Sequence, residues 1–393
     1  MNILAISKGC GLFNPKSGCS NRFSHLVQQL QTSHNVIVLQ SRKFQDLADI
    51  SITKTYYFRH HIGKMTFSLF TDFNPFFIIS MIRILQQHNI DLVQVSSPYG
   101  IVCVKFLSKI LSKHIRVVYD AYNVESEMWA SSYSNGGISA ILRRILSRTY
   151  IQFIEKKATL YADHVISVGH TDKDTFQRFF NVPENKITVI PSGVDIKPLP
   201  AHRTKLEIRR KYALPEDQIV VVFHGSYFHP PNRSAFDQIA NYIAPETFKH
   251  NPNILFLLIG TGVPHYDGIN LLTLGFVEDL HSIFSASDMA IVPLSSGGGT
   301  KLKMLDYLGA GLPIISTNKG IEGLNIVPGQ HSVIAKDVGS DFVRVILQLA
   351  NDPEFRRILG KNARKLAEEE YDWKIIGELL NSLYGKNMTG GHI

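Results

Sequence analysis

The chain has 393 residues, of which 44% are hydrophobic and 19% are charged, and its formal net charge is +8. This length is more than one hydrophobic core usually supports, and the composition is that of a folded protein, which excludes a disordered one. The sequence has no stretch of about 18 consecutive apolar residues, so we expect no membrane-spanning helix.

Short apolar runs alternate with amphipathic segments in the first half of the chain. Such an order is typical of a parallel sheet that is covered by helices on both faces. The predicted strands are 2–7, 35–40, 91–95, 116–120 and 164–168, and the predicted helices are 21–31, 99–111 and 139–161.

The second half of the chain repeats this scheme. Its order predicts a second doubly wound α/β domain. The predicted strands are 220–224, 254–259, 271–274, 289–293 and 313–316, and the predicted helices are 232–240, 280–285 and 301–308.

The boundary between the two predicted domains lies near Ile190-Pro-Ser-Gly-Val-Asp195. Three prolines and the basic run 209–211 follow it, as in a linker that leads into a short helix. We therefore expect an N-terminal domain over 1–195 and a C-terminal domain over 196–370.

Positive charge is concentrated in the first half. Residues 1–196 contain 21 Lys and Arg against 13 Asp and Glu, whereas residues 197–393 contain 20 of each. The excess predicts an anionic partner such as a membrane surface, although a solvated basic surface without a partner also explains it. Helix 139–161 is basic and amphipathic, which fits either a membrane surface or packing on its own sheet. No nucleic-acid-binding motif accompanies the charge, so we expect no nucleic-acid partner.

One glycine-rich loop follows strand 289–293 and reads Ser295-Ser-Gly-Gly-Gly-Thr-Lys-Leu-Lys-Met-Leu-Asp306. The N–H groups of Gly299, Thr300 and Lys301 are candidates to hold a phosphate at a helix N-terminus, with Thr300 as the N-cap. Lys301 and Lys303 add positive charge, and Asp306 is a candidate acceptor for sugar hydroxyls. The alternative is a flexible loop with an ordinary helix cap.

Two more glycine loops follow strands of the second half. They are Gly225-Ser-Tyr-Phe-His-Pro-Pro-Asn232 and Gly260-Thr-Gly262. Each alone is usually a turn, but three such loops at successive strand ends indicate one edge of a binding site. Asn232 is also predicted to cap the helix that follows. The ligand-binding candidates in these two loops are Gly225, Ser226, Asn232, Gly260 and Gly262.

Polar residues gather after strand 116–120 in the first half. Asp120, Tyr122, Asn123 and Glu125 are candidates to bind acceptor hydroxyls or to assist proton transfer. A helix N-terminus rich in acidic residues explains the same pattern equally well. The loop that ends at Gly18 lacks a dinucleotide fingerprint, but Gly18 is a candidate to close over a phosphate.

Metal and targeting signals are not evident. The 16 histidines show no HExxH or related spacing, so we expect no metal site. The N-terminal apolar run is too short for a signal peptide, and we expect a cytoplasmic protein, peripheral on the inner face of the membrane if the basic half binds lipid.

Several segments, taken together in order and spacing, resemble the family 4 glycosyltransferases, of the subgroup with a Gly-Gly-Gly-Thr-Lys/Arg donor loop. They are Gly225-Ser-Tyr-Phe-His-Pro-Pro-Asn-Arg-Ser-Ala235, Gly275-Phe-Val-Glu-Asp279 and Gly297-Gly-Gly-Thr-Lys-Leu-Lys-Met-Leu-Asp-Tyr-Leu-Gly-Ala-Gly-Leu-Pro313, with 120–125 and 190–195. The resemblance covers residues 1 to about 384.

The resemblance implies a GT-B fold, in which two Rossmann-like domains face each other across a cleft and a last helix, 371–385, returns to the first domain. It implies a nucleotide-sugar donor held by the second domain, with Phe276 and Val277 near the base, and a glycan or lipid-linked acceptor held by the first. Sugar transfer would retain the anomeric configuration and need no cofactor or metal ion. The alternatives are a non-catalytic GT-B subunit and, with less support, an epimerase.

Three departures from the family pattern stand out. The two glutamates that the family carries eight positions apart in the donor loop are here Gly298 and Asp306. The Arg and Lys that often bind the diphosphate after the first strand of the second domain are missing, and we expect Lys301 and Lys303 to replace their charge. Tyr122 stands where many relatives have a histidine.

Overall fold

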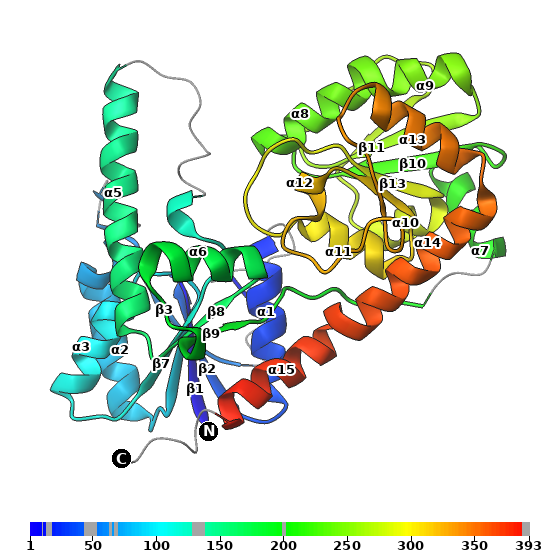
Figure 1. Ribbon diagram of the computed structural model, residues 1–393. Coiled ribbons are helices and arrows are strands. Elements are labelled where there is room, and N and C mark those ends of the chain that lie inside the picture. Colours follow the sequence, from blue (N-terminus) through cyan, green and yellow to red (C-terminus); the bar gives the residue numbers. More distant parts are fainter. Residues whose placement is uncertain are drawn as a thin grey trace. The chain divides into compact units, whose positions relative to one another are not determined.

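The computed structural model describes residues 1–9, 11–12, 18–42, 53–62, 65–66, 70–127, 138–198 and 202–386. The chain divides into two compact units (Figure 1). Unit 1 comprises Met1–Ser192 together with Trp373–Ile393, and unit 2 comprises Gly193–Asp372. The chain therefore leaves unit 1 once and returns to it for its last helix.

Unit 1 is built on a parallel sheet in the order β3-β2-β1-β6-β7-β8-β9. Its central strands are short apolar runs that are buried on both faces, as a parallel sheet requires, whereas the two edge strands are partly buried. They are β1 (Asn2–Ser7), β2 (Asn35–Ser41), β3 (Lys54–Phe58), β6 (Leu92–Val95), β7 (Arg116–Asp120), β8 (His164–Ser167) and β9 (Ile187–Val189), with a separate antiparallel pair β4 (His61–Ile62) and β5 (Met65–Thr66).

Helices cover the two faces of this sheet and form two separate hydrophobic clusters. The helices are α1 (Gly18–Gln31), α2 (Pro75–Gln87), α3 (Ile101–Ile110), α5 (Ile138–Tyr161), α6 (His170–Phe180) and α15 (Trp373–Lys386), with 3₁₀ turns η2 (Thr71–Phe73) and η3 (Glu184–Lys186). α15 packs against α1, and Trp373 stacks on His25 with the ring centroids 4.5 Å apart. Ile376, Leu380 and Tyr384 are buried in the same cluster, so the end of the chain completes the core of unit 1.

Unit 2 has a parallel sheet in the order β12-β11-β10-β13-β14-β15. The strands are β10 (Ile219–His224), β11 (Ile254–Ile259), β12 (Leu271–Gly275), β13 (Met289–Val292), β14 (Ile314–Ser316) and β15 (Val333–Ile334). The helices are α7 (His202–Lys211), α8 (Pro230–Gln238), α9 (Ala244–His250), α10 (Leu280–Ala286), α11 (Leu302–Gly309), α12 (Asn318–Ile321), α13 (Ser340–Ala350) and α14 (Pro353–Leu366), with π-turns η4 (Ile239–Ile243) and η5 (Ala367–Tyr371).

The predicted pair of doubly wound α/β domains is confirmed, whereas two predicted helix caps are wrong. The N-cap of α11 is Lys301 rather than Thr300, and it makes no side-chain cap bond. Helix α8 begins at Pro230, which places Asn232 inside its first turn. None of the helices that the structure describes is long and apolar enough to span a membrane.

Candidate functional site

The carboxyl ends of three neighbouring strands in unit 2 bring the predicted loops together. The N–H of Gly225, after β10, donates to the carbonyl of Ile259 at 2.9 Å, and the N–H of Gly260, after β11, donates to Gly275 at 2.8 Å. A Cβ on Gly260 would lie 1.7 Å from the carbonyl oxygen of Gly225. Glycine is therefore required where these two loops meet, and their backbones form one continuous edge.

The glycine loop after β13 is fastened by Lys301. Its ammonium group donates to the carbonyls of Gly297 and Gly298 at 3.2 Å each and to that of Gly299 at 2.5 Å. The side chain is largely buried, so its charge lies beneath the loop. The Thr300 hydroxyl is also buried and has no hydrogen-bond partner among the described residues. A cation under the loop and an unsatisfied hydroxyl beside it are features of an anion site.

Lys303 is the second buried cation of this region. Its side chain is 8% exposed, its ammonium group donates to Oδ1 of Asn232 at 2.8 Å, and it lies 4.0 Å from the centre of the Phe223 ring. Burial lowers the pKa of Lys303 to about 7, with Lys301 adding to the fall and Asp306 opposing it. None of these contacts within unit 2 fully neutralises Lys303, so an anion would stabilise its charged form.

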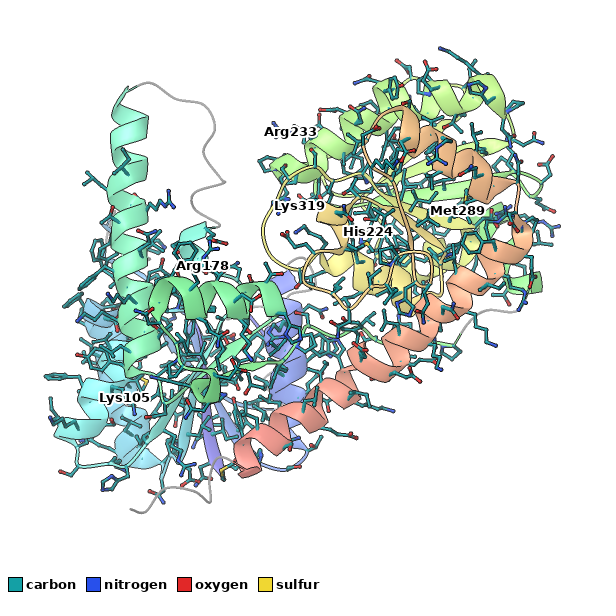
Figure 2. The ribbon with its side chains drawn as sticks, viewed as in Figure 1. Lys105, Arg178, His224, Arg233, Met289 and Lys319 are labelled. Carbon is teal, nitrogen blue, oxygen red and sulfur yellow. The ribbon has the colours of Figure 1, made fainter. Side chains whose placement is uncertain are left out.

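A histidine that sequence reasoning missed holds Asp306 in place. His224 ends β10, and its Nε2 lies 3.2 Å from Oδ2 of Asp306 while its Nδ1 lies 2.9 Å from the Tyr307 hydroxyl. Burial lowers the pKa of His224. Figure 2 shows His224 inside unit 2, among the strands of its sheet. A histidine at the end of an apolar strand has no sequence signal that separates it from an ordinary core residue.

Position 298 offers open space. A Cβ built on Gly298 meets no atom within 4 Å among the described residues, and Gly298 needs no positive φ. Close by, Glu322 lies 3.7 Å from the Lys301 ammonium and 2.6 Å from that of Lys319. Glu322 was not predicted, because it follows a short helix far along the sequence.

The remaining predicted donor residues line the same strand ends. Ser226 is exposed, Asn232 is half-buried, and Phe276, just after β12, is 60% exposed. Val277 is partly buried against the core of unit 2. A Cβ on Gly262 would come within 2.6 Å of the Phe228 ring. The lack of a side chain at Gly262 therefore leaves room for the Phe228 ring.

In unit 1, Asp120 at the end of β7 forms a buried ion pair. Its Oδ1 lies 2.8 Å from the Arg22 guanidinium, both side chains are nearly inaccessible, and Gln94 donates to Oδ2 at 3.2 Å. Arg22 also donates to the carbonyl of Pro191 at 2.8 Å. Through Arg22, Asp120 on β7 is linked to α1 and to the segment at Pro191. Gly18 is the first residue of the same helix α1.

The segment after Asp120 is held by a buried glutamate that the sequence did not reveal. Glu155 on α5 accepts the N–H groups of Glu125 at 2.9 Å and of Ser126 at 3.1 Å. Burial raises the pKa of Glu155 to about 7 and also raises that of Tyr122, which lies beneath the Arg22 side chain. Asn123, in the same segment, is half-buried.

Glu125 lies near a buried lysine from the first loop. Burial raises the pKa of Glu125 and lowers that of Lys8 to about 8, while the attraction between the two groups opposes both shifts. The Lys8 ammonium lies 3.4 Å from the centre of the Tyr99 ring. The hydroxyls of Ser97 and Tyr99 are buried without a partner in the described part of the chain. Such a set of polar groups suits a ligand rich in hydroxyls.

Comparison with known proteins identifies the chain. A model of Glycosyltransferase Family 4 matches residues 17–197, and a model of Glycosyl transferases group 1 matches residues 218–352. The chain belongs to the family 4 glycosyltransferases. The HepE structure from Anabaena in complex with UDP covers 98% of the chain with a TM-score of 0.73 at 14% identity, and all of that structure is covered. This likeness gives the fold as GT-B.

Two curated relatives illustrate the range of the family. An uncharacterized 44.6 kDa protein of the cps region of Klebsiella pneumoniae is 29% identical over 180 residues, which is 42% of this chain and only 45% of that protein. The UDP-Gal:α-D-GlcNAc-diphosphoundecaprenol α-1,3-galactosyltransferase of Escherichia coli is 25% identical over 304 residues, or 73% of each chain.

Proposed function

We propose that this protein transfers a sugar from a nucleotide-sugar donor to a glycan or lipid-linked acceptor, with retention of configuration and without a metal ion. The observation that carries the proposal is a pair of buried lysines, Lys301 beneath the glycine loop after β13 and Lys303 against Asn232, beside an aspartate held by a buried histidine. Family membership supports the reaction class, and the Escherichia coli relative supports a lipid-diphosphate acceptor.

Lys303 and Lys301 would carry the chemistry at the leaving group. The donor diphosphate would bind against the glycine loop, where the two ammonium groups stabilise the charge that grows on the departing phosphate. Asn232, already bonded to Lys303, would orient it. Asp306, held by His224, would accept the ribose hydroxyls, while Phe276 is exposed beside the proposed base site.

In unit 1, Glu125, Asn123 and Tyr122 would bind the acceptor hydroxyls. The raised pKa of Glu125 and the lowered pKa of Lys8 favour proton sharing with a bound hydroxyl. Asp120 is a positioning residue in this proposal, because its carboxylate already pairs with Arg22. In this proposal the departing phosphate takes the acceptor proton, which removes the need for a protein base.

Thermal-shift titration with UDP, GDP and ADP in the presence of a chelator tests the donor site. We expect one nucleotide to raise the midpoint selectively, since a ligand that binds only the folded state stabilises it. Lys303→Met should reduce that rise, while Lys249→Met, which replaces an exposed lysine on α9, should keep it. No shift with any nucleotide would favour the non-catalytic subunit instead.

We also propose that unit 1 binds anionic membrane surfaces through α3 and α5, which contact each other. Part of the apolar face of α5 is buried in unit 1 through Ile151 and Ile154. Other large apolar side chains on the two helices are exposed: Phe106 (63%) and Ile110 (59%) on α3, and Phe153 (55%) and Leu160 (64%) on α5. The neighbouring lysines are Lys109, Lys156 and Lys157. Exposed apolar groups flanked by lysines suit a lipid interface.

Flotation with phosphatidylglycerol vesicles tests this membrane surface. We expect wild type to float and the variant Phe106→Glu/Phe153→Glu to stay in solution, because it removes apolar anchors and adds negative charge. The control is Phe228→Glu/Ile269→Glu, which makes the same change at exposed positions of unit 2. Equal flotation of both variants would contradict the proposal.

A further inference from the structure

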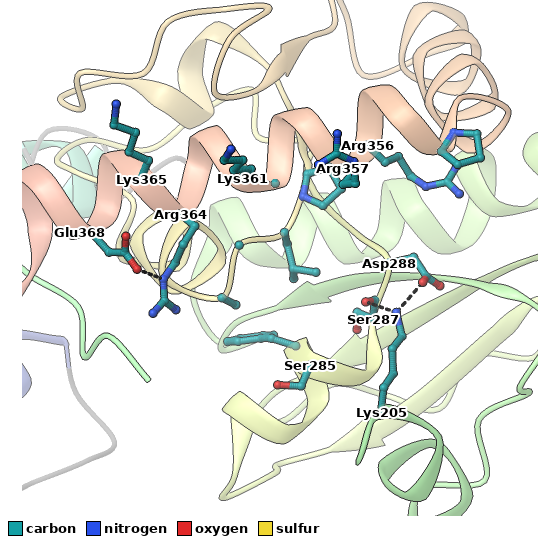
Figure 3. Close-up of a pocket in the computed structure, with 17 residues that line it drawn as sticks. Lys205, Ser285, Ser287, Asp288, Arg356, Arg357, Lys361, Arg364, Lys365 and Glu368 are labelled. Atoms are coloured by element: carbon teal, nitrogen blue, oxygen red, sulfur yellow. Dashed lines mark hydrogen bonds and ion pairs between the residues drawn. The ribbon is translucent and has the colours of Figure 1, made fainter. Parts of the chain in front are cut away.

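A hollow lies in unit 2, away from the glycine loop. Its volume is about 740 Å³, within the range of small-molecule sites. It is lined by α14, by the loop 310–313, and by residues at the ends of α10 and α7 (Figure 3). Asp288 directly precedes β13 and Pro313 directly precedes β14. The hollow therefore opens at the amino-terminal edge of the sheet, whereas the proposed donor site lies at the carboxyl edge.

Basic side chains dominate the wall of this hollow, which is formed by its lining residues. Figure 3 shows Arg356, Arg357, Lys361, Arg364 and Lys365 along α14, with Lys205 and Asp288 on the facing side. The lining cations are Lys205, Arg356, Arg357, Lys361, Arg364 and Lys365, and the lining carboxylates are Asp288 and Glu368. The wall thus carries more positive than negative charge.

The carboxylates in and around the hollow are already paired. Asp288 lies 2.6 Å from both Lys205 and Arg209. Glu368 lies 2.6 Å from Arg364. Just outside, Glu354 pairs with Arg357 at 2.6 Å, and Glu369 lies 3.7 Å from Lys365.

Three cations remain that no carboxylate fully balances. Arg356 donates to the carbonyls of Leu349 and Ala350, which satisfies hydrogen bonds without cancelling its charge. Lys361 is exposed and has no acidic partner among the described residues, and Lys365 has only the distant Glu369. Because guanidinium and ammonium groups bind phosphate oxygens, this excess selects a phosphorylated ligand.

The lining of the hollow is closely packed and partly apolar. A Cβ on Gly360 would lie 2.4 Å from the carbonyl oxygen of Gly311, so α14 lies directly against the loop 310–313. Phe284, Leu312 and Pro313 add apolar surface to the lining. A ligand with a carbon skeleton beside its phosphate groups fits such a wall better than a bare ion.

We propose that this basic hollow binds a small phosphorylated molecule at a site separate from the donor site. Two sources have this chemistry: a free phosphorylated metabolite and the headgroup of an anionic lipid. The site requires no catalytic step and does not depend on the proposed transfer reaction.

Hydrogen–deuterium exchange on the whole protein tests the site with inorganic tripolyphosphate as the soluble probe. We expect slower exchange in peptides of 353–366 and about tenfold weaker binding in Lys361→Glu/Lys365→Glu, because the variant reverses two charges of the wall. Neither lysine holds a backbone carbonyl, so the fold should persist. The control Lys249→Glu/Lys336→Glu carries the same change of net charge on exposed residues of unit 2 and should bind like wild type.

Phosphatidylglycerol vesicles are the second probe, and flotation is the readout. Protection by tripolyphosphate alone assigns the free metabolite, whereas loss of flotation in Lys361→Glu/Lys365→Glu, with the control variant still floating, assigns the lipid headgroup. Protection confined to 295–306, or equal behaviour of the two double variants with both probes, would overturn the proposal.

Discussion

Single buried charges define the proposed donor site. Lys303 is the second residue of α11, and its ammonium group donates to Asn232. Lys301, which was expected to face a ligand, lies under the loop and holds three carbonyls. The two lysines of one motif therefore bond different groups: Lys301 bonds the carbonyls of the glycine loop, and Lys303 bonds Asn232. In the proposed function, both charges lie beside the bound diphosphate.

Proton uptake tests the role of Lys303. Burial lowers the pKa of the free group to about 7, so at about pH 8 the side chain is mostly neutral. A bound diphosphate favours the charged form and raises this pKa. We therefore expect nucleotide binding at about pH 8 to take up about 1 proton. Binding at about pH 6 should take up almost none.

Calorimetric titration in buffers of different ionisation enthalpy measures this uptake. Lys303→Met should remove it, and Lys249→Met should not. An uptake that is equal at both pH values would rule Lys303 out as its source.

Gly298 stands where the resemblance to family 4 predicts a glutamate. Since a Cβ there enters open space, Gly298→Glu should fold normally, with a change in unfolding free energy within about 0.5 kcal/mol. We expect the new carboxylate to raise turnover at saturating donor without tightening nucleotide diphosphate binding, because it would meet the sugar rather than the phosphates. Steady-state kinetics and nucleotide titration separate the two effects. The control is Gly298→Gln, whose side chain is of similar size but neutral. An equal gain in turnover with this variant would show that the negative charge is not the cause.

At the scale of elements, the apolar runs predicted the central strands well. β1, β7 and β11 begin and end where the sequence indicated. Edge strands such as β3 were missed, because a half-buried strand such as Lys54–Phe58 carries a weaker apolar signal. The predicted cap of α11 was wrong because the helix begins one residue later, and Lys301, at the N-cap, bonds the carbonyls of the glycine loop instead of capping the helix. Likewise, His224 and Glu155 were missed because their partners lie far along the chain.

Helix α15 supplies part of the core of unit 1, and a matched pair of leucines tests this. Leu380 is fully buried, whereas its neighbour Leu379 is 47% exposed. We expect Leu380→Ala to cost about 2–5 kcal/mol of unfolding free energy and Leu379→Ala less than about 0.5 kcal/mol. Chemical denaturation measures both, and similar losses would show that α15 does not pack as described.

At the scale of the whole molecule, two units with separate cores should unfold in separable steps. Leu380→Ala should lower the transition of unit 1, while the selected nucleotide should raise that of unit 2, to which the proposed donor site belongs. Scanning calorimetry with and without nucleotide measures both shifts. A single transition that moves with both changes would contradict independent cores.

The return of α15 to unit 1 has a consequence for synthesis on the ribosome. Domains usually fold in the order in which they emerge, at about 5–20 residues per second. Here the residues of unit 2, Gly193–Asp372, all appear before the helix that completes unit 1. Unit 2 can therefore fold first. The surface of α1 that α15 covers stays exposed for roughly 10–40 s until α15 has been synthesised. A premature stop codon that removes α15 would leave the core of unit 1 incomplete and the surface of α1 exposed.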